Sequence, residues 1–173
     1  MSDILKPPIY AEVAGPLIFL AGPIQGAADW QAEASRILAP VAGVTVASPR
    51  RPEAAPGEFT EKDYAAQVDW EHHYLARAAA NGVTMFWLAK EAVHVCERAY
   101  AQTTRFELGE AVTLHRLRGA KVAVGIEPGF SNMRYLLRTI ARKAPGIPIC
   151  GTLAETCAEA VRLALAAPDA DRG

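Results

Sequence analysis

Val83-Thr84-Met85-Phe86-Trp87-Leu88 is the stretch that decides the fold of this chain. It is an apolar run interrupted by Thr84 alone, and it begins directly after Asn81-Gly82, a pair typical of the end of a helix. A strand without alternating polar side chains is covered on both faces, as the strands of parallel sheets are. The run therefore predicts a parallel sheet with helices on both sides.

Further apolar runs lie on both sides of this strand, separated by amphipathic segments. The predicted strands cover residues 17–21, 44–47, 83–88, 121–125 and 147–150, and the predicted helices cover about 30–39, 61–80, 105–118, 131–143 and 152–165. Asp29, Ser131 and Thr152 are the expected helix caps. Regular alternation of strands and helices predicts an α/β protein with a doubly wound parallel sheet. We expect one domain over 1–173, with a core at about 15–166 and flexible termini; the tail from 167 should be frayed.

Composition excludes several classes of protein. The chain has 173 residues, 51% of them apolar, and a net charge of −1, so no basic stripe argues for polymeric nucleic acid. Apolar runs are shorter than the ~18 residues of a membrane span, and the N-terminus lacks a secretory signal. Three scattered cysteines, Cys96, Cys150 and Cys157, make neither a disulfide framework nor a metal set with His94. We expect a cytoplasmic protein with reduced thiols, without metal or cofactor.

The segment Thr104-x-x-Glu107 carries the strongest candidate for chemistry. It should open a helix just after a loop that follows strand 83–88, where open α/β sheets bind ligands. In that first turn the helix dipole keeps Glu107 ionised, so that it can act as a nucleophile. The same spacing also fits a capping box, in which Thr104 and Glu107 bond each other's backbone amides. From the residues alone both interpretations stay open.

Two other places can bind a ligand. The loop from Gly22 to Asp29 is rich in small residues, although it is neither a dinucleotide fingerprint nor a P-loop, and a simple tight turn is the alternative. Glu71 lies on the buried stripe of helix 61–80, so it must be paired at the edge of the core or face a cavity.

Other polar residues are expected to be solvated. Asp69, His72 and His73 should point away from the buried stripe of the same helix. The pair Arg50-Arg51 can touch a phosphate, but a solvated pair is the simpler expectation.

The segments Phe19–Ile24 with Trp30, Trp70-Glu71, Phe86-Trp87 and Thr104–Gly109 resemble, in this order, the nucleoside 2-deoxyribosyltransferase-like family. The resemblance extends over about residues 17–165. It implies a flavodoxin-like, five-stranded sheet with the strand order 2-1-3-4-5. It also implies cleavage of the bond between a base and a (deoxy)ribose.

The resemblance also assigns roles to residues. Glu107 matches the family's nucleophilic glutamate, which forms a covalent glycosyl intermediate. Glu71 falls about where the family places a second acid, which would protonate the leaving base or hold the sugar. Asp69 is a weaker candidate for that second acid. The implied substrate-binding residues are Gly22, Pro23, Ile24, Trp30, Asp69, Thr104, Gly109, Asn132 and Met133. Asn132-Met133 resembles a segment that reaches into a neighbouring subunit's site, which implies a homo-oligomer, at least a dimer.

Departures from the family pattern point to a divergent branch. Ala101 stands where the transferases carry an acid that contacts the base, and Phe19 and Leu20 stand where an aromatic hydroxyl is expected. The link over 89–103 is also longer than expected. The predicted activity is therefore cleavage or transfer at the N-glycosidic bond of (deoxy)nucleosides or nucleotides, by a glycosyltransferase or an N-glycoside hydrolase. The alternatives are a non-catalytic binding or sensor protein for such ligands, and a structural domain with no hollow beside Glu107.

Overall fold

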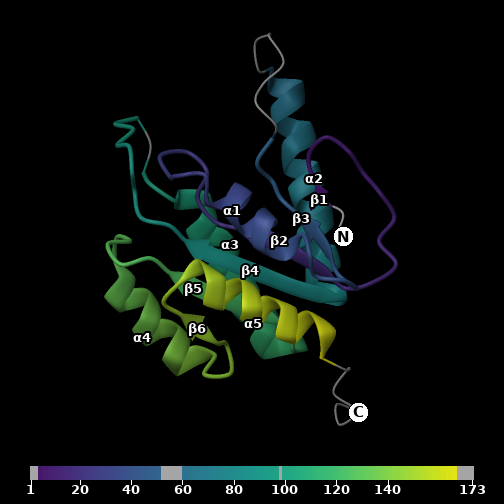
Figure 1. Ribbon diagram of the computed structural model, residues 1–173. Coiled ribbons are helices and arrows are strands. Elements are labelled where there is room, and N and C mark those ends of the chain that lie inside the picture. Colours follow the sequence, from purple (N-terminus) through teal and green to yellow (C-terminus); the bar gives the residue numbers. More distant parts are fainter. Residues whose placement is uncertain (1–3, 52–59, 98, 167–173) are drawn as a thin grey trace.

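The computed structural model describes residues 4–51, 60–97 and 99–166 (Figure 1). Residues 52–59, between the third strand and the second helix, and the tail from 167 lie outside the described residues. In chain order the elements are β1 (Ile4–Leu5), β2 (Leu17–Ala21), α1 (Trp30–Leu38), β3 (Thr45–Ala47), α2 (Glu61–Ala80), β4 (Gly82–Leu88), α3 (Gln102–Arg118), β5 (Val122–Ile126), α4 (Met133–Lys143), β6 (Ile149–Cys150) and α5 (Leu153–Leu165).

The strands form one sheet with the order β1-β3-β2-β4-β5-β6, in which every pair of neighbours is parallel. The five expected strands therefore lie in the expected order, and the doubly wound α/β prediction is confirmed. The chain turns to one side of β2 to make β3 and to the other side to make β4. This reversal creates a switch point, where the loops after neighbouring strands separate and leave room for a ligand.

The sixth strand, β1, was not among the strands predicted from the sequence. Ile4 and Leu5 pair with Val46 and Ala47 of β3, and the Ser48 amide donates to the Leu5 carbonyl at 2.9 Å. A two-residue strand has no readable periodicity, so sequence patterning missed it. It covers the backbone groups that would otherwise make β3 an open edge.

The segment after β1 is also fixed, by side chains of α2. The Trp70 indole nitrogen donates to the Ile9 carbonyl at 2.8 Å, and the Tyr74 hydroxyl bonds both the amide and the carbonyl of Ala11. Arg77 donates to the carbonyls of Val13 and Gly15 at 2.8 and 2.9 Å. These bonds hold α2, which carries Glu71, in one orientation against the sheet.

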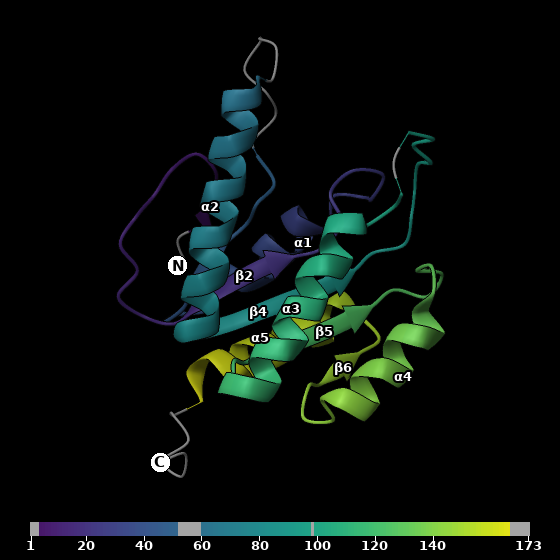
Figure 2. The same cartoon turned by 180° about the vertical axis from the view of Figure 1, so that it is seen from behind.

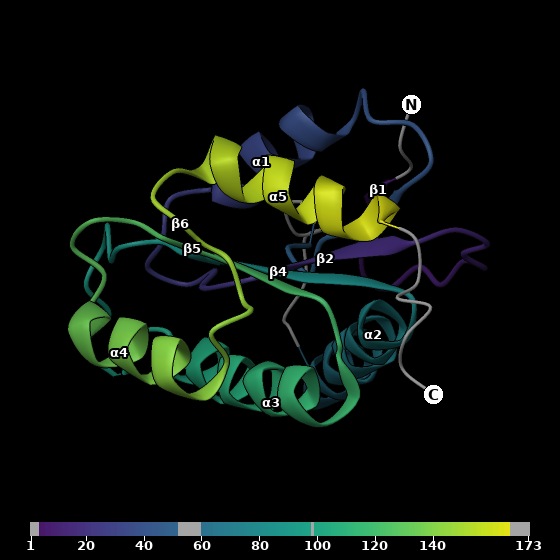
Figure 3. The same cartoon turned by 90° about the horizontal axis from the view of Figure 1, so that it is seen from below.

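Two layers of helices enclose the sheet. Figure 3 shows α1 and α5 on one face and α2, α3 and α4 on the other, and Figure 2 shows the second layer from its outer side. Along β2, Ile18 and Leu20 pack with α1 and α5, whereas Leu17, Phe19 and Ala21 pack with α2 and α3. Because both sets are buried, β2 reads as a continuous apolar run, as expected for such a sheet.

Helix ends agree with the sequence in most cases. The Asp29 carboxylate accepts from the Ala32 amide at 3.0 Å, and Thr152 forms a capping box with Glu155. Ser131 does not cap α4; Asn132 occupies that position with a left-handed φ of 59°. Ser131 instead accepts hydrogen bonds from the Arg105 guanidinium on α3, through its carbonyl and its hydroxyl. Tertiary contact with α3 has replaced the local cap.

Within the described ranges, no helix combines the length and apolarity needed to cross a membrane. The same residues contain no cluster of three or more histidine, cysteine or acidic side chains suited to a metal ion. All three cysteines are unpaired.

Candidate functional site

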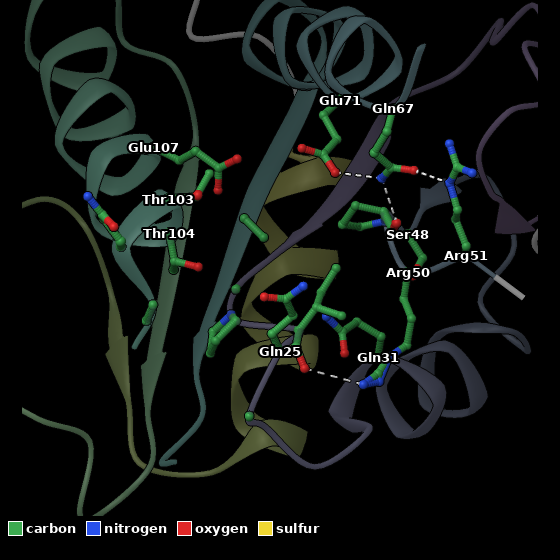
Figure 4. Close-up of a pocket in the computed structure, with 18 of the residues that line it drawn as sticks. Gln25, Gln31, Ser48, Arg50, Arg51, Gln67, Glu71, Thr103, Thr104 and Glu107 are labelled. Carbon is green, nitrogen blue, oxygen red and sulfur yellow. Dashed lines mark hydrogen bonds between the residues drawn. The ribbon is translucent and has the colours of Figure 1, made fainter. Parts of the chain in front are cut away.

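A cavity of about 1320 Å³ lies at the carboxyl ends of β2, β3 and β4. Its walls are the loops that follow β2 and β3, the exposed link after β4, and the facing sides of α2 and α3 (Figure 4). This is the position where open parallel sheets bind ligands. The interpretation of the chain as a structural domain without a hollow beside Glu107 is therefore wrong, because Glu107 lines this cavity.

Glu107 lies in the second turn of α3, not in its first turn as expected. The helix begins at Gln102, and its N-cap residue Ala101 has a left-handed φ of 56° and makes no side-chain cap. Thr104 is consequently the third helical residue, so the capping box with Glu107 does not form. In the described part of the chain, no group donates a hydrogen bond to the Glu107 carboxylate. The carboxylate extends into the cavity (Figure 4).

The protonation of Glu107 also differs from expectation. Burial raises its pKa from 4.5 to about 8, and the nearby carboxylates of Glu71 and Glu110 add to this effect. The helix dipole was expected to keep the group ionised, but its influence is confined to the first turn. Glu107 lies one turn further along, where burial and the nearby Glu71 carboxylate set its pKa. Glu107 is therefore mostly protonated at neutral pH in the free protein.

Glu71 reaches the same cavity from α2, and in Figure 4 its carboxylate and that of Glu107 point toward each other. Its hydrogen-bond partner lies on the same helix: the Gln67 amide nitrogen donates to Glu71 Oε1 at 2.6 Å. Burial raises the pKa of Glu71, and the hydrogen bond from Gln67 opposes that rise. Glu107 has no such donor, so the two carboxyl groups have different environments within one cavity.

The orientation of the Gln67 amide is fixed by three hydrogen bonds. Arg51 Nε donates to Gln67 Oε1 at 2.7 Å, and Gln67 Nε2 donates to the Pro49 carbonyl at 2.9 Å as well as to Glu71. Because Arg51 can only donate, the oxygen of the amide must face it and the nitrogen must face Glu71. Oε1 of Glu71 is thus always an acceptor, and a proton on Glu71 resides on Oε2. The sequence signal for Gln67 was its spacing of four residues from Glu71 on one helix.

The loop after β2 forms one wall of the site. Gly22, Pro23 and Ile24 line the cavity, as the resemblance implied. Gly22 leaves no room for a side chain, because a Cβ there would lie 2.4 Å from the Trp87 carbonyl and 2.6 Å from the Trp30 ring. Trp30 is buried beneath the loop, and its Nε1 donates to the Pro23 carbonyl at 2.8 Å. Trp30 therefore supports the wall and does not line the cavity.

The two arginines after β3 are not a solvated pair. Both are half-buried and line the cavity. Arg50 Nε lies 3.3 Å from Asp29 Oδ1, and its Nη2 donates to the Ile24 carbonyl at 3.5 Å. Arg51 donates from Nη2 to the Asp63 carbonyl at 2.8 Å, besides its bond to Gln67. Arg50 thus connects the loop after β3 to the loop after β2, and Arg51 connects it to α2. Sequence spacing did not reveal these contacts.

Not every expected residue reaches this cavity. Thr104 lines it, and so does Ala101 at the start of α3. Asp69 is exposed on α2 and faces away. Gly109 and Asn132 line a smaller hollow of about 320 Å³ between α3 and α4. Met133 packs against the core.

A parallel sheet with helices on both faces and a cavity at its switch point defines the flavodoxin-like class of α/β proteins. Residues 15–129 match the family model described as "Nucleoside 2-deoxyribosyltransferase like". The chain belongs to this family, which confirms the resemblance seen in the sequence. The matched residues include Glu71 and Glu107 but not Asn132 and Met133. A comparison with curated protein sequences gives no match.

Proposed function

We propose that this protein breaks the N-glycosidic bond of a (deoxy)nucleoside or nucleotide, with Glu107 as nucleophile and Glu71 as acid and base. The observation that carries the proposal is the pair of carboxyl groups, brought from α3 and α2 into one cavity of a protein of this family. Two carboxyl groups on opposite sides of a scissile bond are the machinery of retaining glycoside cleavage. No metal or cofactor takes part in this scheme.

The proposed reaction steps follow from the different surroundings of the Glu107 and Glu71 carboxyl groups. The Glu107 carboxylate attacks the anomeric carbon, the carbon–nitrogen bond breaks, and its electron pair leaves with the base. The departing base takes the proton that Glu71 carries on Oε2, since Gln67 occupies Oε1. Water then attacks the glycosyl–Glu107 ester, gives its proton to Glu71, and releases the sugar and the Glu107 carboxylate. In a transferase a second base replaces that water.

The raised pKa of Glu107 sets a pH dependence for the first step. Only the ionised form attacks, and with a pKa of about 8 roughly one-tenth of the free protein is in this form at pH 7. Among the described residues, no hydrogen bond to the Glu107 carboxylate lowers its nucleophilicity once it has ionised. The departing base also takes a proton from Glu71, so activity needs Glu107 ionised and Glu71 protonated. We therefore expect a bell-shaped pH profile of kcat/KM, which rises at low pH as Glu107 ionises and falls at high pH as Glu71 loses its proton.

Incubation with a panel of nucleosides and their 5′-monophosphates, followed by measurement of free base, tests the proposal. Glu107→Gln preserves the size and polarity of the side chain but removes the nucleophile, so base release should fall at least a thousandfold. Intact-mass measurement should detect a glycosyl adduct on the parent protein and none on the variant. Equal base release by both proteins would overturn the assignment.

One observation favours a second candidate function, binding without cleavage. Ala101, in place of the family's acid, lines the cavity, so one group that contacts the base in the transferases is missing here. A binding protein would be stabilised thermally by nucleosides without forming product, and Glu107→Gln would bind them as tightly as the parent. Product formation that depends on Glu107 decides against this candidate.

We also propose that the chain assembles into at least a dimer through α3 and α4. Exposed apolar side chains on these helices support this, among them Phe106 at 77%, Leu117 at 74% and Tyr135 at 64% exposure. In such an assembly the segment at Asn132 would meet a neighbouring subunit. Light scattering on the parent and on Phe106→Glu measures it: the parent should be oligomeric, and the variant should shift toward monomer.

A further inference from the structure

The wall of the cavity formed by α1 and the end of β3 carries polar groups that the proposed chemistry does not use. Gln31 on α1 and Ser48 after β3 are each only 1% exposed, and both line the cavity. Within the described residues, neither the amide nitrogen nor the amide oxygen of Gln31 has a hydrogen-bond partner, and the Ser48 hydroxyl has none. Arg50 Nε beside them lacks a hydrogen bond as well, with only the ion-pair contact to Asp29.

Such groups are costly in a folded protein. A buried polar group without a partner destabilises the fold by about 1–3 kcal/mol, and native proteins contain few of them. Apolar residues would fill the same space at no such cost. Several unpaired groups on one wall of a ligand-sized cavity therefore indicate that the ligand itself supplies the partners.

We propose that Gln31 and Ser48 form a subsite that recognises the hydrogen-bonding edge of a nucleobase, with Arg50 as an additional donor. This inference rests on the proposed function for the position of the sugar. The carboxamide of Gln31 presents a donor next to an acceptor, and nucleobase edges present the complementary acceptor next to a donor. The Ser48 hydroxyl can play either part.

A phosphate group fits this subsite poorly. Phosphate oxygens accept hydrogen bonds, so they would satisfy Arg50 and the Gln31 nitrogen but leave the Gln31 oxygen buried and unpaired. A base edge satisfies all of these groups at once. The Arg50 guanidinium does not by itself favour an anionic ligand, because the Asp29 carboxylate already lies 3.3 Å from Arg50 Nε.

The placement of the subsite agrees with this assignment. In Figure 4, Gln31 lies on the α1 side of the pocket, away from Glu107 on the α3 side. The cavity of about 1320 Å³ is larger than a sugar alone requires, so a nucleoside can reach both sides. The subsite also supplies a means of base recognition that Ala101 cannot.

The experiment compares ligands that differ only at the base edge: adenosine with purine riboside, and uridine with 2-pyrimidinone riboside. Binding is measured by ligand-induced thermal stabilisation in the Glu107→Gln background, where no turnover intervenes. This variant should prefer the ligand with the complete edge by roughly 10- to 100-fold in one of the two pairs. Adding Gln31→Met, which keeps the volume but removes both polar atoms, should abolish the preference without lowering the melting temperature of the free protein.

Ser48→Ala should weaken the same preference, and it provides a second variant if Gln31→Met does not fold. Arg36→Met is the control, because this exposed side chain lies on the same helix as Gln31 but does not line the cavity; it should leave the preference intact. Unchanged edge preference in Gln31→Met and Ser48→Ala, or an effect limited to 5′-monophosphates, would overturn the subsite while leaving the proposed cleavage standing. Loss of the edge preference in Gln31→Met, together with no base release by the parent protein, would instead retain the subsite and remove the enzymatic proposal.

Discussion

Replacing Glu107 by Gln should change how the stability of the protein depends on pH, independently of any activity. The folded protein holds the Glu107 proton up to a pKa of about 8, whereas an exposed glutamate in the unfolded chain loses its proton near pH 4.5. Between these values the folded state binds more protons than the unfolded state, so this group makes the free energy of unfolding fall as pH rises. The stabilisation is fully present below pH 4.5 and is lost as pH rises through about 8.

The size of the effect follows from the pKa shift. A shift from 4.5 to about 8 corresponds to about 5 kcal/mol in full, and about 4 kcal/mol of it should develop between pH 5 and pH 9. Glutamine cannot titrate, so Glu107→Gln should gain this amount over the parent across the same range. The unpaired amide of the new glutamine costs about 1–3 kcal/mol, but it costs the same at every pH.

Urea unfolding of the parent and the variant at each pH from 5 to 9 measures this difference. Glu12→Gln is the matched control, because Glu12 is an exposed acid that does not line the cavity. If Glu107 were a helix cap, its pKa would be low, and the variant would lose stability as pH rises. A flat or falling difference for Glu107→Gln would refute the placement of this carboxyl group in a desolvated cavity.

Three further changes test the other residues that shape the cavity. Glu71→Gln removes a charge that raises the pKa of Glu107, so the pH-dependent loss of stability should move to lower pH in the same urea titrations. Gln67→Leu removes the donor to Glu71 Oε1, so the pKa of Glu71 should rise further. The pH profile of kcat should then shift, and kcat should fall by a larger factor than KM changes. An unshifted pH profile would contradict a positioning role for Gln67. Trp30→Phe deletes the hydrogen bond to the Pro23 carbonyl, so it should lower the free energy of unfolding by about 1 kcal/mol in denaturant melts. It should also raise KM, because that bond holds the loop after β2. An unchanged KM would show that this loop does not touch substrate.

Local pattern predicted most of the fold because both faces of the sheet are covered. Strands such as 83–88 are apolar except for Thr84, the apolar residues of the helices recur every three to four positions, and caps such as Asp29 and Thr152 satisfy backbone groups close to them in sequence. Where a contact from a distant element replaces a local one, prediction failed. Ser131 bonds Arg105 of α3 instead of capping its own helix.

The candidate site was predicted less completely, for the same reason. Glu71 and Glu107 were found because their residue types and spacing are unusual, but their shared cavity and the protonation of Glu107 depend on water excluded by the whole fold. The capping-box spacing at Thr104 was misleading, since α3 begins earlier than its local signals predict. Gln31 and Ser48 carried no sequence signal at all.

The sequence by itself determined the alternation of strands and helices and the parallel sheet, and it marked Glu71 and Glu107 as candidate residues, because these features depend on neighbours within a few positions of the chain. Only the tertiary structure decided that α2 and α3 turn their carboxyl groups toward each other, that Gln67 fixes one of them as an acceptor, and that Glu107 keeps its proton near pH 7. Burial and the approach of distant charges set these properties, and neither exists until the chain has folded.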